Sequence, residues 1–367
     1  MRVNFILPSY ISTPVGGFRV VYEYADFLAS RGHTVTVVFP RRQRKAEEPA
    51  SWLELMKQQF WGLKKRLSNR PLIPWHTLHP NVKIALVPVL TDAFIPDADA
   101  TVATMWSTAP PVADLSLAKG KKFYLIQHHE IWAGSAEEVN ATWLLPLHKI
   151  VISKWLQELG EQLGATDMRH IPNGIDLDRF RVITPPQTRQ FSILTLNHHE
   201  AFKGVPDALA ALSCYHERFP NVPVSMFGAQ PRSSQIPDWI KYFHNPSQDA
   251  LVRDIYNQHA VYLGASLAEG WALPPAEAMA CGCTFVGTDI GGFRDYSADG
   301  DTALLSPPGD RGALLQNLVR ITEDAELRVR IQRRGTENIQ QFTWAAAGRA
   351  MEEYLKEQAS AQPEMVV

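Results

Sequence analysis

The sequence predicts an α/β protein built from two doubly wound, parallel-sheet domains. Short apolar runs alternate with amphipathic segments along most of the chain, which is the rhythm of repeated strand–helix–strand units. Residues 33–39 are a nearly continuous run of β-branched residues, as a strand buried on both faces of a parallel sheet requires. The length of 367 residues suits about two domains of ordinary size.

The expected elements follow one another at regular intervals in both halves of the chain. In the first half, a loop at residues 8–17 leads into a helix with one apolar face, which closes at Gly32. In the second half, one helix is expected after Gly204, two at 311–341 and a last one at 344–357. The predicted strands are residues 3–7, 33–39, 82–87, 100–104, 122–127, 149–152 and 169–173 in the first half, and 191–196, 222–227, 260–265 and 284–287 in the second.

These elements divide into two domains. We expect the first at residues 1–180, with an insertion at 41–80, and the second at 181–343. Pro185 and Pro186 lie in a stretch, residues 180–189, that is typical of a linker. Residues 344–367 are expected to form a final helix and a tail.

Composition excludes several classes of protein. A hydrophobic content of 45% and a charged content of 20% are ordinary for a globular protein, and a net charge of −2 gives no basic field for nucleic acid. The three cysteines, Cys214, Cys281 and Cys283, are too few for a disulfide framework and lack zinc-site spacing. The chain runs from Met1 directly into a predicted strand, and no apolar run reaches transmembrane length, so we expect a cytoplasmic protein.

Two glutamates, Glu269 and Glu277, mark the most informative stretch. The apolar run ahead of them predicts a buried strand, and Pro274 and Pro275 suit the first turn of a helix. Glu269 is therefore expected on a strand-to-helix loop and Glu277 about one turn into the helix. Such loops meet the free N–H groups of helix N-termini and bind ligands, so the pair of carboxylates fits a diphosphate-sugar. An ordinary helix start with an acidic first turn would explain one of the two glutamates.

The same stretch resembles a known family. Its frame, Glu-Gly-x-x-Leu-Pro-x-x-Glu-Ala-Met-Ala-x-Gly from Glu269 to Gly282, resembles the donor-site motif of retaining glycosyltransferases of the family 4 type, also called glycosyl transferases group 1. The resemblance implies the GT-B fold, in which two Rossmann-like domains face a cleft and the terminal helix crosses back to the first domain. It also implies a nucleotide-diphosphate-sugar donor, no required metal or other cofactor, and a glycan, lipid-linked or other hydroxyl acceptor.

Other stretches resemble further motifs of the family. Residues 171–176, followed by Phe180, resemble the PNGVDxxxF segment that ends the first domain, and residues 291–295 resemble the GGxPE turn. The resemblance gives Glu277 the donor ribose, Lys203 the diphosphate, and Glu269 a place near the transferred sugar. It gives Gly16 and Gly17 a glycine-rich loop whose amides approach the diphosphate. The expected donor-binding set is Gly16, Gly17, His198, Lys203, Gly270, Trp271, Leu273, Glu277 and Arg294, and the expected catalytic residues are Glu269, Lys203, His128 and His129.

The sequence also departs from the family pattern. Relatives carry an arginine a few residues before the lysine, whereas residues 196–202 contain none. His198 or His199 could replace it with a weaker or pH-sensitive phosphate contact. Arg294 occupies the proline position of the GGxPE turn and could supply charge, and Asp295 replaces the glutamate.

His128 and His129 follow a predicted strand. The resemblance implies that one histidine at this strand end faces the donor sugar and acceptor, where it could bond a hydroxyl or assist proton movement. Because adjacent residues of an extended chain point in opposite directions, only one of the two can do so. Loop histidines bonded to backbone remain an alternative, and with Glu130 the composition also permits a metal site.

Residues 41–70 carry nine basic and three acidic residues, a net charge of +6, beside apolar and aromatic residues near helical spacing. A basic amphipathic helix of this kind can lie on an anionic membrane surface, which would place the protein at the inner face of the membrane. The alternative is an insertion helix whose apolar stripe packs on its own domain.

The sequence also bears on two other classes of function. A nicotinamide-dependent dehydrogenase would carry G-x-G-x-x-G after the first strand, and residues 8–17 do not. A non-catalytic GT-B partner or scaffold protein would suit the missing arginine and the altered turn, whereas Glu269, Lys203 and Glu277 favour an enzyme.

Overall fold

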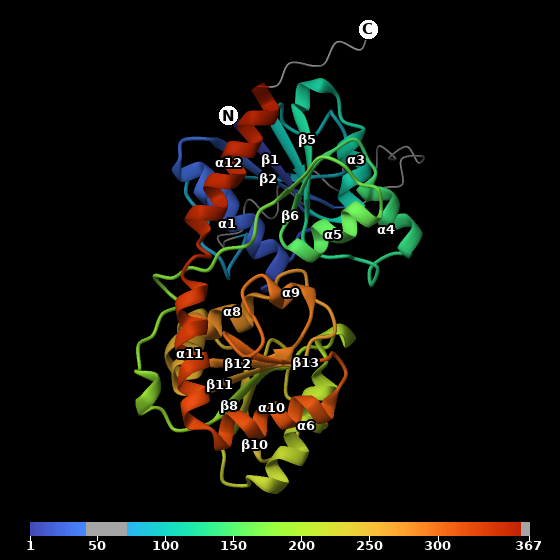
Figure 1. The fold of residues 1–367 in the computed structure, drawn as a ribbon. Helices are drawn as coiled ribbons and strands as arrows, with labels where there is room; N and C mark the ends of the chain where they lie inside the picture. The colour runs from blue at the N-terminus through green and yellow to red at the C-terminus, as the bar shows by residue number, and fades with distance from the viewer. Residues whose placement is uncertain (42–71, 361–367) are drawn as a thin grey trace. The chain divides into compact units, whose positions relative to one another are not determined.

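The computed structural model describes residues 1–41 and 72–360, which form two compact units. The N-terminal unit comprises Met1–Asn173 with Trp344–Val367, and the C-terminal unit comprises Gly174–Thr343. Each unit holds a parallel β-sheet with helices packed on it (Figure 1). The predicted fold class of two doubly wound α/β domains is confirmed.

The N-terminal unit has seven described strands in the order β3-β2-β1-β4-β5-β6-β7, and every pair is parallel. Chain order reverses at β1, which pairs with β2 on one side and β4 on the other. The strands are β1 (Arg2–Ile6), β2 (Thr34–Pro40), β3 (Lys83–Val87), β4 (Ala100–Ala103), β5 (Lys121–Ile126), β6 (His148–Val151) and β7 (Met168–His170), and the helices are α1 (Gly16–Ser30), α3 (Ala109–Ala113), α4 (Ala136–Trp143), α5 (Lys154–Gln162) and α12 (Trp344–Ser360).

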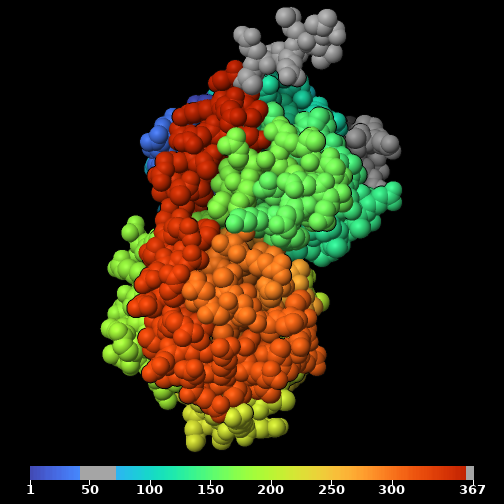
Figure 2. Space-filling view, in the orientation of Figure 1, coloured from blue at the N-terminus to red at the C-terminus, as the bar shows by residue number. Residues whose placement is uncertain are grey.

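The C-terminal unit has six strands in the order β10-β9-β8-β11-β12-β13, again all parallel. Chain order reverses at β8, between β9 and β11. On the face seen in Figure 2, the orange and red atoms of α10 and α11 cover this sheet. The strands are β8 (Ile193–Leu196), β9 (Val224–Gly228), β10 (Ile240–His244), β11 (Val261–Gly264), β12 (Thr284–Thr288) and β13 (Ala303–Ser306), and the helices are α6 (Val205–Arg218), α7 (Gln248–Ala250), α8 (Leu273–Ala280), α9 (Gly291–Arg294), α10 (Arg311–Glu323) and α11 (Ala325–Ile339).

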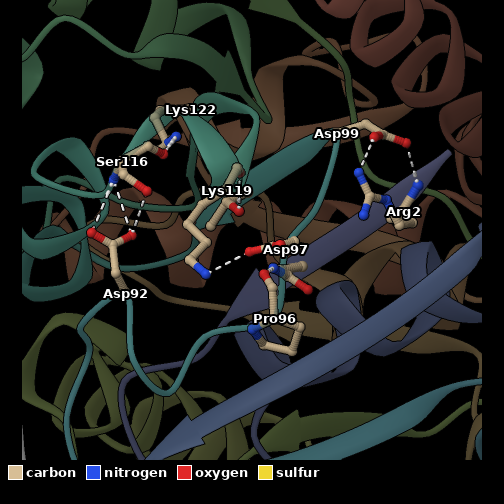
Figure 3. A network of polar contacts seen from close by, with 10 residues as sticks. Arg2, Asp92, Pro96, Asp97, Asp99, Ser116, Lys119 and Lys122 are labelled. Atoms are coloured by element: carbon tan, nitrogen blue, oxygen red, sulfur yellow. Dashed lines mark hydrogen bonds and ion pairs between the residues drawn. The ribbon is translucent and has the colours of Figure 1, made fainter.

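The amino ends of the strands in the N-terminal unit are held by a network of polar contacts (Figure 3). Lys119 is 7% exposed and its Nζ lies 2.7 Å from Oδ1 of Asp97, while Arg2 pairs with Asp99 at 2.9 Å. The Oδ1 of Asp92 accepts a hydrogen bond from the backbone N–H of Ser116 at 3.0 Å. These charges join the segments that precede β4 and β5, at the edge opposite to the one where parallel sheets bind ligands. We assign them to the stability of the sheet.

Helix α12 belongs to the N-terminal unit and packs along α1. Gly348 allows this close approach, since a Cβ there would lie 2.3 Å from Cγ of Phe27. Further along α12, the buried Glu352 accepts hydrogen bonds from His33 at 2.9 Å and Arg31 at 3.2 Å. Burial raises the pKa of Glu352, and the bonds from Lys356, His33 and Arg31 outweigh that effect and lower it to about 2. The last helix is thus fixed by an ionised carboxylate.

The division between the units falls at Gly174, earlier than the expected start of the second domain at residue 181. The reason is that the proline-containing linker is bonded to the C-terminal unit. The side-chain oxygen of Asn257, a fully buried residue, accepts from the backbone N–H groups of Ile183 at 2.7 Å and Thr184 at 3.2 Å. Arg189 donates to the carbonyl of Cys281 at 2.6 Å. A stretch that is typical of a linker is here part of a domain.

Candidate active site

The carboxyl ends of β8 and β11 define the site in the C-terminal unit, because they flank the point where strand order reverses. In open parallel sheets ligands bind at this point. Lys203 follows β8, and Glu269 lies in the loop between β11 and α8. Pro274 and Pro275 lie in the first turn of α8, and Glu277 lies about one turn into that helix. A small pocket between these strand ends has Lys203, Ser266 and Glu269 among its lining residues.

Lys203 and Glu269 form a bidentate ion pair. The Nζ of Lys203 lies 2.8 Å from both carboxylate oxygens, and the hydroxyl of Ser266 donates to Oε1 of Glu269 at 2.9 Å. The side chains are 17% and 8% exposed, so the pair is largely shielded from water. An ammonium group has three donors, and two of them are used here, which leaves one for a ligand oxygen.

Two glycines bring the surrounding loops against this pair. Gly204 has a left-handed backbone with φ of 62°, and a Cβ there would lie 1.8 Å from the carbonyl oxygen of Ala265 at the end of β11. Gly292, in α9, packs on the loop from the other side, since its Cβ would lie 2.4 Å from the carbonyl oxygen of Glu269. Any side chain at either position would push Lys203 or Glu269 out of place.

Glu277 is 4% exposed and accepts a hydrogen bond from the hydroxyl of Tyr256 at 3.1 Å. Burial, together with the nearby charge of Glu277, raises the pKa of Tyr256 well above its ordinary value, so the phenol stays a donor. Tyr256 lies outside every motif in the sequence, and no local pattern identifies it as a partner of Glu277.

Three other residues of the expected donor site have mainly packing contacts. Trp271 is 4% exposed, and its ring lies 4.7 Å from that of Tyr296 and 5.7 Å from that of Phe342. Gly270 and Leu273, on either side of it, are also buried. These residues shape the loop that carries Glu269.

His198 occupies the region where relatives carry an arginine. Its ring stacks on His199 with centroids 4.7 Å apart, and its Nδ1 accepts the backbone N–H of Glu200 at 3.2 Å. Burial, followed by the charge of Lys203, lowers the pKa of His198 to about 4. His198 is therefore neutral at physiological pH. With Nδ1 acting as acceptor, its proton lies on Nε2, which can donate one hydrogen bond.

Arg294 has an ion-pair partner close by in the sequence. Its guanidinium contacts both carboxylate oxygens of Asp289, at 2.7 and 3.0 Å, and the hydrogen bond from Arg294 lowers the pKa of Asp289. The charge that could have replaced the missing arginine is thus engaged by Asp289.

The N-terminal unit gathers a second group of residues at the carboxyl ends of β1, β4 and β5. Gly16 and Gly17 begin α1, and a Cβ on Gly17 would lie 3.4 Å from the side chain of Gln127, which follows β5. Gln127 in turn donates to the carbonyl of Thr104, after β4, at 3.4 Å. These loops therefore adjoin at the point where strand order reverses.

The two histidines after β5 have different surroundings. The Nε2 of His129 lies 2.8 Å from the side-chain oxygen of Asn140, on α4, whereas Nδ1 of His128 lies 3.0 Å from the carbonyl oxygen of His129.

Glu130 is 8% exposed and accepts the backbone N–H of Trp106 at 2.7 Å. Burial raises the pKa of Glu130 to about 7. The sequence alone connects Glu130 with a metal site and with no other role. Within residues 1–41 and 72–360, no three His, Cys, Asp or Glu side chains are grouped to hold a metal ion.

The basic segment at 41–70 lies outside the described residues, apart from Arg41, as does most of the expected insertion at 41–80. Among the helices that the structure describes, none combines the length and apolarity needed to cross a membrane.

Cys281 and Cys283 are buried free thiols, and burial raises the pKa of Cys283 to about 12.

Curated relatives match nearly the whole chain. Phosphatidyl-myo-inositol mannosyltransferase of Mycolicibacterium smegmatis is 24% identical over 94% of this chain and 91% of its own length. Over a shorter stretch, 29% of this chain and 27% of the relative, O-antigen chain mannosyltransferase B of Escherichia coli is 28% identical.

Solved structures share the fold. The structure of Anabaena HepE in complex with UDP-glucose aligns with a TM-score of 0.73 and 17% identity, over 97% of this chain and all of that one. Sucrose-phosphate synthase from Thermosynechococcus elongatus aligns with a TM-score of 0.71 and 16% identity, over 98% of this chain and all of that one.

Family models cover both units. The model described as Glycosyltransferase Family 4 matches residues 15–179, and the one described as Glycosyl transferases group 1 matches residues 191–324. With two Rossmann-like units and a buried lysine–glutamate pair at a strand switch point, these matches define a glycosyltransferase of the GT-B fold. The chain belongs to the group 1, family 4 glycosyltransferases. A non-catalytic role finds no support, since the curated relatives are enzymes.

Proposed function

We propose that this glycosyltransferase retains the anomeric configuration of a sugar that it transfers from a nucleoside-diphosphate donor to a hydroxyl of a glycan or lipid-linked acceptor. The pair of Lys203 and Glu269 carries the proposal, because it sets a cation and a carboxylate at the strand switch point where a ligand is expected. Relatives that act on lipid-linked or polysaccharide acceptors support the class of reaction.

Each residue has a role that follows from its surroundings. The third donor of Lys203 binds an oxygen of the diphosphate, while Glu269 keeps the ammonium in place and lies near the transferred sugar. Glu277 accepts from the ribose hydroxyls with one carboxylate edge steadied by Tyr256. The neutral His198 supplies an N–H to the phosphates where relatives use a cation.

The chemical step asks the protein mainly for electrostatic stabilisation. As the bond between the sugar and the diphosphate breaks, negative charge grows on the departing phosphate, and Lys203 stabilises it in a partly dry site. The acceptor hydroxyl attacks from the same face, and its proton passes to the departing phosphate. This route retains the configuration and asks for no metal ion.

The experiment is donor turnover followed by proton NMR. The protein is incubated with UDP-, GDP- and ADP-linked sugars without acceptor, and slow transfer to water is monitored through the anomeric protons. We expect one donor class to be consumed and the first product to have the donor's configuration. Inverted first product would overturn retention, and no consumption or nucleotide binding with any donor would overturn the proposed donor chemistry.

We also propose that residues 41–70, through their net charge of +6, bring the enzyme to anionic membrane surfaces, where lipid-linked acceptors reside. Charge is the basis of this proposal.

A further inference from the structure

Trp132 is an exception among the tryptophans in residues 1–41 and 72–360. Half of its surface, 50%, is exposed, and so is 48% of Ile131, the residue before it, whereas Trp143, Trp271 and Trp344 are at most 8% exposed. Exposed apolar side chains on consecutive residues are candidates for contact with a ligand. The pair lies in the turn directly after His128 and His129, at the carboxyl end of β5.

The backbone under Trp132 is firmly held. The carbonyl of Glu130 accepts the N–H of Ala133 at 2.9 Å, and its buried carboxylate accepts the N–H of Trp106. Gly134 packs closely on the Trp106 ring, since a Cβ there would be 2.6 Å from Cζ2. These contacts hold the backbone on both sides of Trp132, which lowers the entropy lost when a ligand binds there.

The position of the turn selects the kind of ligand. Gln127 links the end of β5 to the loop after β4 and to Gly17 at the start of α1, so Trp132 belongs to the ligand edge of the N-terminal sheet. Gln127 and the two histidines, which carry donors and acceptors of hydrogen bonds, follow the same strand end and precede the apolar pair in the sequence. A sugar ring needs this combination, because its C–H face is apolar while its hydroxyls are polar.

We propose that Trp132 is the platform on which the ring of the carbohydrate acceptor stacks, and that Glu130 is the positioning residue that holds it there. The inference rests on the proposed function, which it deepens by naming a residue for the acceptor. The electron-rich face of the indole attracts the partly positive C–H groups of a pyranose or cyclitol ring. The ring's hydroxyls then reach the histidines after β5, which orients one of them for transfer.

Saturation-transfer NMR on the full-length protein tests this assignment. The probes are methyl α-D-mannopyranoside, methyl α-D-glucopyranoside and myo-inositol, which distinguish pyranose from cyclitol acceptors. We expect at least one probe to receive saturation on its ring C–H protons from the wild type. Trp132→Ala should weaken that binding by about threefold to tenfold, and Trp132→Phe, which keeps an aromatic face, should retain most of it.

Controls separate stacking from general damage. Leu117→Ala removes an exposed apolar side chain, 95% exposed, that precedes β5 at its opposite end, and it should leave probe binding unchanged. Leu117→Ala should also leave consumption of the donor in water unchanged. Glu130→Ala, which leaves the Trp106 N–H without its acceptor, should weaken probe binding, and Glu130→Gln, which keeps an oxygen for that N–H, should restore it.

Two results would overturn the assignment. One is equal saturation of the probes by wild type and Trp132→Ala, or none by the wild type. The other is loss of binding to phosphatidylglycerol vesicles in Trp132→Ala with unchanged probe binding, which would make Trp132 a membrane contact. Either result, when the wild type consumes a donor, refutes the platform alone, whereas failure of the wild type to bind or consume any donor refutes the proposed function.

Discussion

At the scale of single residues, the candidate site in the C-terminal unit consists of Lys203, Glu269 and Glu277 and the side chains that hold them. The motif frame singles out Glu269, Glu277 and Lys203, and the structure joins Lys203 to Glu269 directly. The motif frame does not reveal Tyr256, whose hydroxyl donates to Glu277 although the two residues are 21 positions apart in the sequence. They meet because both belong to one tertiary core. The motif frame also does not reveal that Arg294 is paired with Asp289, since this ion pair depends on local side-chain geometry.

Glu277 provides the first prediction. If it binds the donor ribose, Glu277→Ala should weaken nucleotide binding by about 1.5–3 kcal/mol, the worth of hydrogen bonds to a charged group. Calorimetric titration of the nucleoside diphosphate measures this loss. Glu323→Ala, which removes an exposed carboxylate on α10, is the matched control and should bind normally. Unchanged affinity in Glu277→Ala would remove the residue from the site.

Lys203 provides the second prediction, which has two readouts. If the ammonium stabilises the departing diphosphate, as proposed, Lys203→Ala should lower turnover more than it weakens binding of the sugar-free nucleoside. It should also reduce the free energy of unfolding by up to about 3–5 kcal/mol, since Glu269 is left buried without its cation. Urea denaturation and steady-state kinetics measure the two effects.

The double variant Lys203→Met with Glu269→Gln separates those effects. It removes both charges together, so most of the stability should return while turnover stays low. Recovery of turnover along with stability would show that the pair serves the fold alone.

At the scale of elements, most strands are predictable from the sequence and two edge strands are not. Each predicted strand overlaps an observed one, including β3 and β7 at the edges of the N-terminal sheet. The two strands that the sequence does not predict, β10 and β13, are the edges of the C-terminal sheet. β10, with the sequence IKYFH, mixes polar and apolar residues and is partly exposed, whereas β13 is a mostly buried run of four residues. A partly exposed edge strand such as β10 needs one buried face at most, so its composition resembles that of a loop.

The turn between β5 and α4 provides a prediction about pH. The pKa of Glu130 is about 7 in the folded protein, against an ordinary value of 4.5, because burial disfavours the charge. The folded state therefore binds this proton more tightly than the unfolded state between pH 4.5 and 7. The stability that the protonated Glu130 contributes is fully present below pH 4.5 and is lost as the pH rises through 7.

Glu130→Gln should remove that pH dependence, because the amide has no proton to lose and still offers an oxygen to Trp106. At pH 8 we expect the variant to be more stable than the wild type by about 3 kcal/mol, at 1.36 kcal/mol per pKa unit. The difference should shrink at pH 5. Urea denaturation at the two pH values measures it. An offset that is equal at both would mean that Glu130 does not titrate in this range.

At the scale of the whole molecule, the two units hold complementary groups of residues. Glu269, Glu277 and Lys203 lie in the C-terminal unit, whereas the glycine loop, the two histidines after β5 and Trp132 lie in the N-terminal unit. In each unit the residues gather where strand order reverses, after β8 and β11 in one and after β1, β4 and β5 in the other. The doubly wound topology explains why motifs far apart in the sequence meet.

The last prediction concerns how the whole enzyme reaches its acceptor. The chain has a net charge of −2, yet residues 41–70 carry +6, so basic charge is concentrated in one short segment. Attraction to anionic lipid is worth about 1 kcal/mol for each basic residue near the surface, and salt screens it. We expect the protein to sediment with phosphatidylglycerol vesicles at low salt and to be released at high salt, and to ignore vesicles of neutral lipid.

Charge reversal of Lys64, Lys65 and Arg66 to glutamate should release the protein from anionic vesicles while leaving nucleotide affinity intact, because donor binding is assigned to the other unit. The matched control is the same reversal at three exposed arginines of α10 and α11, which changes the net charge equally and should not affect sedimentation. These are Arg320, Arg330 and Arg333. Equal release by both triple variants would show that net charge governs binding. Failure of the wild type to sediment at low salt would favour an acceptor that is not held at a membrane.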